Sequence, residues 1–68
     1  MKIIIKLKEL LRDRGISRTK LSRITEMNLH QINKYCNNDV KRLDTDTLAK
    51  LCYVVDCELG ELIEYEAD

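Results

Sequence analysis

The sequence predicts an all-α fold of five short helices, forming one domain over residues 1–68. Its apolar residues recur with the spacing of one helix face. Ser, Asn or Asp residues, which are favourable helix N-caps, precede several of these apolar stretches. Proline is absent and glycine occurs only twice, so no linker divides the chain. A chain of this length has room for one small core.

The first helix is expected over residues 6–14. Leu7, Leu10 and Leu11 follow the i, i+3, i+4 spacing of a helix face. Gly15 follows them and is well suited to the position just past a helix end.

The second and third helices are expected close together. Ser17 is a good N-cap for the second helix, which runs to about Ile24 with Leu21 and Ile24 facing inward. Asn28 is the expected N-cap of the third helix, and Gln31 three residues later completes a capping-box pattern.

The third helix extends to about Cys36 and has two different faces. With 3.6 residues per turn, one face carries Asn28, Ile32, Tyr35 and Cys36. The opposite face carries side chains that can all hydrogen-bond: His30, Asn33, Lys34 and Asn37. Asn37 and Asn38 are suited to a left-handed exit, because Asn tolerates positive φ better than most residues.

The fourth helix begins after Asp44, and Asp46 places negative charge in its first turn, where the helix dipole favours it. Its inward face is formed by Leu48, Leu51, Cys52 and Val55. A short fifth helix is expected to begin near Leu59.

Both ends of the chain have strand-like patterns. Residues 2–5 are mostly β-branched, and the last residues alternate Ile63, Tyr65 and Ala67 with Glu64, Glu66 and Asp68. The two segments could pair as a short terminal β-ribbon, although a sheet of two strands is only marginally stable without packing support.

Residues 17–36 are interpreted as a helix-turn-helix unit. Two short helices that follow each other closely must cross at a steep angle, so the second can project its far face into a DNA major groove. The hydrogen-bonding face of the third helix and the basic pair Lys41-Arg42 after it fit that use. Nucleic-acid binding is therefore the leading hypothesis.

The charge distribution supports this hypothesis although the net charge is zero. Residues 1–42 contain eleven Lys or Arg and four Asp or Glu, whereas residues 43–68 contain one Lys and eight acids. The first part, at +7, could neutralise phosphates, and the second, at −7, could keep the protein soluble. Alternatively, the asymmetry arises by chance or serves self-association.

The cysteines Cys36, Cys52 and Cys57 fall where helices need small apolar groups, and buried free thiols are expected. A zinc site that combines them with His30 is conceivable, but their spacing matches no usual ligand pattern. We therefore expect neither a metal nor another cofactor.

The order of the elements resembles the Cro-like phage-repressor helix-turn-helix family, also called the xenobiotic-response-element family. The resemblance covers nearly the whole chain, and the order of its motifs is more specific than any one of them. These are Gly15-Ile16-Ser17, Leu21, Ile32, Asn37-Asn38-x-x-Lys41-Arg42, Asp46-Thr47-Leu48, Leu51-Cys52, Asp56-Cys57-Glu58 and Gly60-Glu61-Leu62-Ile63-Glu64-Tyr65. The ending is similar to a subgroup of very small regulators made of this domain alone. The resemblance implies a five-helix fold like that of lambda repressor.

Three positions depart from the family pattern. Glu26 stands where the turn between helices 2 and 3 usually has Gly, and a left-handed Glu would carry strain of ~1 kcal/mol. Arg18 replaces a usual Gln and can still reach a phosphate, and Asn38 replaces a usual Gly.

The resemblance and the chemistry together suggest contacts to DNA. The candidates for base edges are Asn28, Leu29, His30, Asn33 and Lys34. Lys34 can donate to guanine, His30 can donate or accept, and Leu29 could contact a thymine methyl. Leu29 could equally pack at the edge of the core, and His30 could be a solvated surface residue. The candidates for phosphates are Ser17, Arg18, Lys20, Asn37, Lys41 and Arg42.

The sequence therefore predicts a DNA-binding transcriptional regulator, most simply a repressor. We expect a homodimer through the C-terminal region. Its apolar residues there are more than a short terminal helix can readily hide, namely Leu59, Leu62, Ile63 and Tyr65. The alternative is a protein-interaction module of the same fold without DNA binding, such as an antitoxin-like or anti-repressor partner.

Catalysis finds little support, because the single histidine has no nucleophile and third partner near it in the sequence. No apolar run reaches the ~18 residues of a membrane span. The isoleucine run near the start is too short for a signal peptide, so a cytoplasmic protein is expected.

Overall fold

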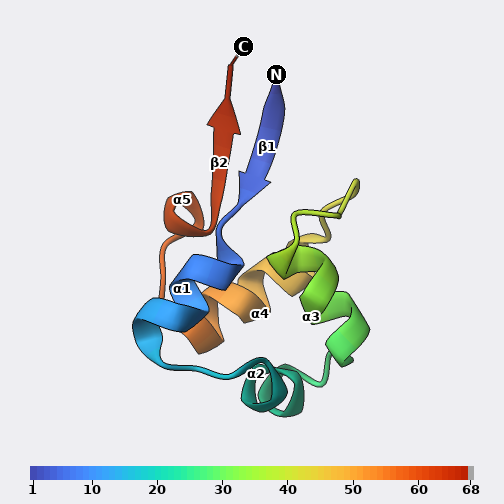
Figure 1. The fold of residues 1–68 in the computed structure, drawn as a ribbon, viewed down its shortest axis with the longest axis vertical. Coiled ribbons are helices and arrows are strands. Elements are labelled where there is room, and N and C mark those ends of the chain that lie inside the picture. The colour runs from blue at the N-terminus through green and yellow to red at the C-terminus, as the bar shows by residue number, and fades with distance from the viewer. Residues whose placement is uncertain (68) are drawn as a thin grey trace.

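The computed structural model describes residues 1–67 and contains five helices and one two-stranded sheet (Figure 1). In chain order the elements are β1 Lys2–Ile5, α1 Leu7–Arg14, α2 Arg18–Thr25, α3 Leu29–Cys36, α4 Thr45–Val55, α5 Leu59–Leu62 and β2 Ile63–Glu66. The helices form one body, from which the two strands project side by side. The predicted five-helix fold with a terminal ribbon is confirmed.

The β-ribbon is antiparallel and pairs the two ends of the described chain. Ile3 faces Tyr65, and Ile5 faces Ile63. The alternation of the last residues is that of a strand, as predicted, although β2 ends at Glu66 and Asp68 lies outside the described residues. Ile63 starts this strand.

Ion pairs at the ribbon join glutamates of the second half of the chain to lysines of the first half. Lys2 Nζ lies 3.5 Å from a Glu66 carboxylate oxygen, and Lys6 pairs with Glu64. The Glu64 carboxylate raises the pKa of Lys6 through a hydrogen bond and through its charge. Part of the positive half of the chain is therefore neutralised by folding.

The outer edge of β1 is covered by a side chain from the end of α3. Asn38 Oδ1 accepts a hydrogen bond from the Ile5 N–H at 2.9 Å, and Nδ2 donates to the Ile3 carbonyl at 3.4 Å. Asn38 is left-handed with φ 57°, whereas Asn37 before it is not, with φ −91°. Of the predicted left-handed exit, Asn38 alone adopts the conformation, and its amide takes the place of a neighbouring strand.

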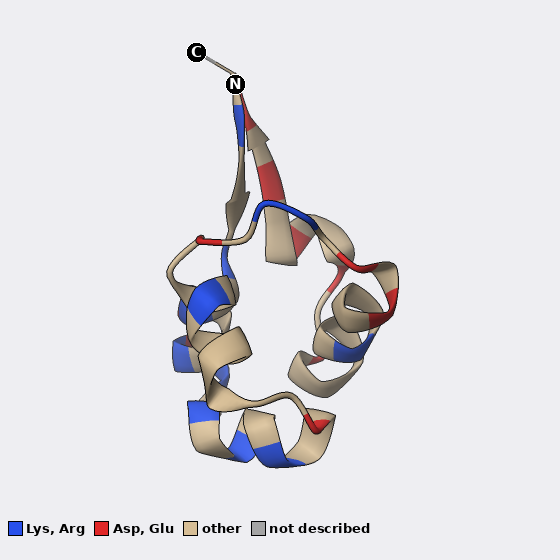
Figure 2. Cartoon of the chain, turned by 90° about the vertical axis from the view of Figure 1, so that its right-hand side faces the viewer, with Lys and Arg blue, Asp and Glu red and all other residues tan. Residues whose placement is uncertain are grey.

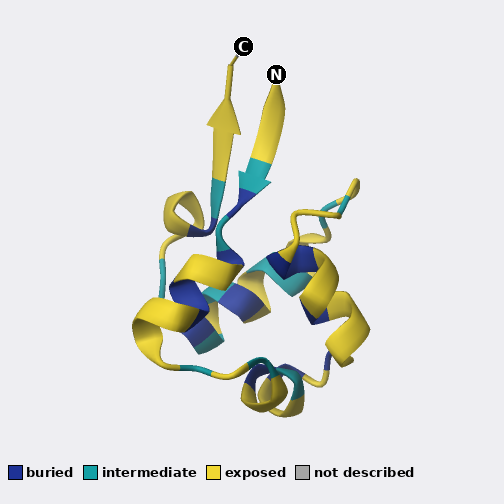
Figure 3. Cartoon of the chain, viewed as in Figure 1, coloured by how far each residue is buried: buried dark blue, intermediate teal, exposed yellow. Residues whose placement is uncertain are grey.

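The core lies between the helices and extends to the base of the ribbon (Figure 3). Its buried apolar members are Ile5, Leu7, Leu10, Leu11, Leu21, Met27, Ile32, Tyr35, Cys36, Leu51, Val55 and Leu62. The inward positions predicted for α1 and α3 are confirmed, apart from Asn28, which is exposed as the N-cap of α3.

The predicted inward position of Ile24 is wrong. Ile24 is 51% exposed, whereas Thr25 is 3% exposed. The buried stripe of α2 runs through Leu21 and Thr25, four positions apart, and Ile24 falls to one side of it. Thr25 can be buried because its hydroxyl donates to the Leu21 carbonyl at 2.7 Å and accepts from the Met27 N–H at 3.3 Å.

The cysteines only partly match the expectation. All three are free thiols, but only Cys36 is buried, and Cys52 and Cys57 are half-buried. Cys57 lies in the turn between α4 and α5 and not in a helix. Burial raises the pKa of Cys36, and burial together with the neighbouring Cys52 raises the pKa of Cys57 to about 11.

Arg14 links α1 to the end of α4. Its Nε donates to the Val55 carbonyl at 2.9 Å and its Nη2 to the Asp56 carbonyl at 3.1 Å. A cation at a helix C-terminus is favourable because carbonyl groups there lack helical partners. Within residues 1–67, no helix is both long enough and apolar enough to cross a membrane.

Candidate nucleic-acid interface

The start of α2 is held by its N-cap. Ser17 has an extended backbone, and its Oγ accepts from the Lys20 N–H at 3.0 Å. This bond leaves other N–H groups of the first turn of α2 without helical partners, which is the usual feature of an anion-binding helix start. Arg18, the first residue of α2, is half-buried, and Lys20 is exposed.

The turn between α2 and α3 contains a left-handed glutamate. Glu26 has φ 64°, the conformation for which Gly is the usual residue. Around it, the Ser22 hydroxyl donates to the Met27 carbonyl, and Lys50 Nζ donates to the Thr25 carbonyl at 3.3 Å. The turn therefore adopts the left-handed backbone usual for Gly although a glutamate occupies the position, and the next residue, Met27, is buried.

The predicted capping box at the start of α3 is present. Asn28 Oδ1 accepts from the Gln31 N–H at 2.8 Å, and the Gln31 side chain accepts from the Asn28 N–H at 3.4 Å. Ile32 is fully buried, and it fixes the rotation of α3 about its axis. The opposite face is exposed and carries Leu29, His30, Asn33, Lys34 and Asn37.

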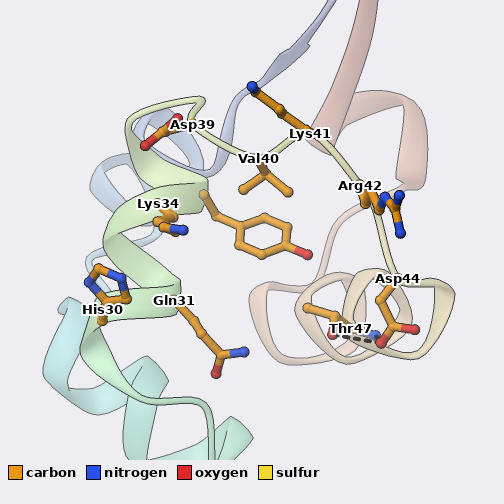
Figure 4. A pocket seen from close by; sticks show the side chains of 10 residues that line it. His30, Gln31, Lys34, Asp39, Val40, Lys41, Arg42, Asp44 and Thr47 are labelled. Atoms are coloured by element: carbon orange, nitrogen blue, oxygen red, sulfur yellow. Dashed lines mark hydrogen bonds between the residues drawn. The ribbon is translucent and has the colours of Figure 1, made fainter.

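The exposed face of α3 lies between α2 on one side and the loop that leads to α4 on the other. On one side, Asn33 Oδ1 accepts a hydrogen bond from Arg18 Nη1 at 2.7 Å. On the other side, His30 and Lys34 line a hollow of about 560 Å³ between α3 and the loop that leads to α4 (Figure 4). Leu29 is 44% exposed and is not among the residues that pack against the core.

The hollow gathers cations from separate segments. Lys41 and Arg42 of the loop line it together with Lys34 of α3 (Figure 4). His30 and Tyr35 also line it. Burial, followed by the nearby Asp44 carboxylate, raises the pKa of the Tyr35 hydroxyl, while a hydrogen bond with Thr47 lowers it. The hollow is thus lined by a phenol whose raised pKa favours the neutral form, by three cations and by the carboxylates of Asp39 and Asp44.

The charges of the folded chain differ from the simple division seen in the sequence. Lys2, Lys6 and Arg14 lie against acids of α5 and β2, with 3.7 Å between Arg14 and Glu61. Figure 2 shows basic segments along α2 and the loop after α3, and acidic ones along β2 and the start of α4. Residues 17–42 keep six Lys or Arg and two acids, and the basic surface is therefore centred on α2 and the loop after α3.

Most of the residues predicted for the site lie on α2, on the exposed face of α3 or in the following loop. Two of them are engaged as N-caps, since Ser17 and Asn28 already accept backbone hydrogen bonds. Sequence reasoning did not identify Tyr35 as part of the hollow, because its spacing marks it only as a core residue. Nor did it identify the Arg18–Asn33 bond, since the sequence does not specify which residues of the two helices meet.

Comparisons with known proteins place the chain among helix-turn-helix proteins. The model of the Cro/C1-type HTH DNA-binding domain matches residues 6–68. The HTH-type transcriptional regulator YozG of Bacillus subtilis (strain 168), itself uncharacterised, is 29% identical over 68 residues, covering 100% of this chain and 81% of that protein. A crystal structure of a Bacteroides fragilis protein, provisionally described as DNA-binding, superposes with a TM-score of 0.83 and 17% identity, covering 93% of this chain and 100% of the other. The last likeness concerns the fold alone.

Proposed function

The chain belongs to the Cro/C1-type HTH DNA-binding domain family, and we propose that it is a transcriptional regulator that binds specific sequences of double-stranded DNA. The observation that carries the proposal is the exposed polar face of α3, flanked by the basic loop residues Lys41 and Arg42. The simplest mode of regulation is repression, because a bound protein can block a promoter by occupancy alone.

In the proposed complex α3 lies in the major groove and its exposed side chains meet base edges. Lys34 donates to guanine O6 or N7, His30 donates or accepts, and Leu29 contacts a thymine methyl. The start of α2, with Arg18 and Lys20, approaches one stretch of phosphates.

Lys41 and Arg42 approach phosphates on the other side of α3, where the hollow of about 560 Å³ provides room for a sugar-phosphate segment. Asn37, exposed at the end of α3, lies next to this loop in sequence and completes the set of phosphate candidates. Contacts to phosphates position the protein on the duplex without reading the base sequence of the DNA.

The first test is the salt dependence of binding to duplex DNA. If about five phosphates are contacted, log K falls with log salt concentration with a slope of roughly −4 to −5. The double variant Lys41→Ala/Arg42→Ala should weaken binding to all sequences alike and make the slope shallower. The matched control is Lys2→Ala/Lys6→Ala, which removes the same charge from two lysines that pair with acids of β2. No binding at low salt would instead favour the protein-interaction module.

The second test addresses base reading by His30 and Lys34. Each change to Ala should lose about 1–3 kcal/mol on the preferred site and relax the preference at one position. Circular dichroism should not change, because both side chains are exposed. If both variants keep the full site preference, the reading face is placed wrongly.

We also propose that the protein binds DNA as a homodimer through its C-terminal region, because useful specificity normally requires two half-sites about one helical turn apart. The apolar surface that motivates this is smaller than the sequence suggested, since Leu62 is fully buried and Ile63 half-buried. Leu59 is 48% exposed and Tyr65 60% exposed. The edge of β1 is covered by Asn38, so a shared sheet would form through β2.

Leu59→Glu and Tyr65→Ser test the dimer without touching the core. They should dissociate it and weaken binding to a two-half-site operator more than to random DNA. Sedimentation equilibrium measures the mass, and Tyr53→Ser is the control, since Tyr53 is 87% exposed on α4, outside this region. A wild-type monomer of 8.0 kDa with full site-specific affinity would contradict the dimer.

A further inference from the structure

The hydrogen bond between Arg18 and Asn33 limits what Asn33 can recognise. Arg18 Nη1 donates to Asn33 Oδ1 at 2.7 Å, at the short end of the range for charge-assisted bonds. The bond joins the first residue of α2 to the exposed face of α3. Its direction engages the acceptor of the Asn33 amide, and the amide Nδ2 donates to no partner among residues 1–67.

An amide reads adenine by using both of its ends. Nδ2 donates to adenine N7 while Oδ1 accepts from the N6 amino group. Here a guanidinium already lies against Oδ1, and its positive charge opposes the approach of a second N–H donor to the same oxygen. Asn33 is therefore poorly suited to the adenine contact that is usual for this residue type.

We propose that Arg18 and Asn33 act as one donor-only unit that selects an acceptor-rich base edge, an inference that rests on the proposed DNA binding. Guanine offers O6 and N7, and thymine offers O4, whereas adenine and cytosine each present an amino donor. The unit disfavours adenine and cytosine as the base whose edge Asn33 contacts.

Docking strengthens this preference. The Arg18–Asn33 bond is exposed to solvent in the unbound protein. Exclusion of water at an interface lowers the local dielectric and makes a retained hydrogen bond stronger. Breaking the bond to read adenine would leave a desolvated cationic donor without its partner, which is costly.

The experiment selects bound sequences from a random duplex pool with the full chain. The position that Asn33 reads is the one whose preference disappears in Asn33→Ala. At that position the wild type should prefer G and T on one and the same strand over A and C on that strand. Arg18→Ala should raise the ratio of A to G on that strand by roughly fivefold or more, the lower end of what one bidentate contact discriminates. Lys20→Ala also removes a charge from the first turn of α2, and it should weaken binding to all sequences without changing that ratio.

The outcomes separate this inference from the proposed function. A wild-type preference that does not favour G and T together on one strand, an unchanged ratio in Arg18→Ala, or no effect of Asn33→Ala on any position overturns the donor-only unit while DNA binding stands. Failure of the wild type to enrich any sequence at low salt overturns DNA binding and this inference together. Thermal melting of each variant confirms that it is folded.

Discussion

Removal of the Asn38 side chain is expected to loosen the β-ribbon from the helical body. Its amide holds Ile5 N–H at 2.9 Å and the Ile3 carbonyl at 3.4 Å. The first bond is partly buried and of ordinary length, so its loss should lower the free energy of unfolding by about 1 kcal/mol. The second hydrogen bond is long and exposed, so its loss should lower the free energy of unfolding by roughly a few tenths of a kcal/mol at most. Asn38→Gly is therefore expected to lose about 1–1.5 kcal/mol from these two bonds, with no strain because Gly accepts the φ of 57°. The larger entropy of Gly in the unfolded chain adds a further loss of roughly 0.4–1 kcal/mol.

Asn38→Ala loses the same two hydrogen bonds and also places Ala in a strained left-handed backbone conformation. A left-handed Ala is strained by about 1–2 kcal/mol, while Gly has a larger entropy in the unfolded chain, worth roughly 0.4–1 kcal/mol. The Ala variant should therefore be less stable than the Gly variant by about 0.5–1 kcal/mol. In a domain of this size, 1 kcal/mol corresponds to roughly 4–8 °C in Tm.

Urea denaturation and amide hydrogen exchange measure these effects. The exchange of the Ile5 amide should accelerate in both variants, because its acceptor is removed. Asn37→Ala is the matched control, since Asn37 is exposed, has negative φ and makes no hydrogen bond to the ribbon within residues 1–67. Wild-type stability in Asn38→Ala, with unchanged protection of Ile5, would refute the account of Asn38 as the cover of the β1 edge.

Three further predictions concern stability and reactivity. Ile32→Ala should lower the free energy of unfolding by ~2–5 kcal/mol, because the side chain is fully buried, and a folded variant of unchanged Tm would show that it does not fill the core. Glu26→Gly should raise stability by about 0.5–1 kcal/mol by relieving the strain at φ 64°, and a lower Tm would contradict this. Folding raises the pKa of the Cys57 thiol from 9.0 to about 11, so the folded protein favours the neutral thiol. The contribution of Cys57 to the free energy of unfolding is therefore full below pH 9 and is lost as the pH rises through 11. Alkylation of Cys57 at pH 8, followed by mass spectrometry, should be at least about tenfold slower in the folded protein than in urea, and equal rates would be the contrary result.

Local patterns were sufficient to predict the helices and most of their ends. The caps at Ser17, Asn28 and Asp44 act within three residues of chain, and all three accept the expected hydrogen bonds. The leucine spacing of α1 and the inward side of α3 likewise depend only on helical periodicity. The alternation at the C-terminus predicted a strand for the same reason.

Side-chain contacts between elements could not be predicted in this way. Ile24 and Thr25 differ by one position, and the burial of the threonine depends on the Met27 N–H that the turn brings to its hydroxyl. Charge counted along the chain also overstated the basic surface, because Lys2 and Lys6 meet acids of β2 only when the ends of the chain pair.

The sequence by itself therefore determined the all-α class, the positions of the helices and which face of α3 is exposed, because each depends on interactions between neighbours in the chain. The tertiary structure alone decided that Asn38 covers β1, that Arg18 occupies the acceptor of Asn33, and that Lys41 and Arg42 share a hollow with Lys34. The physical reason is that these contacts depend on the crossing of the elements and on the rotation of α3, which is set by the packing of Ile32 in the core.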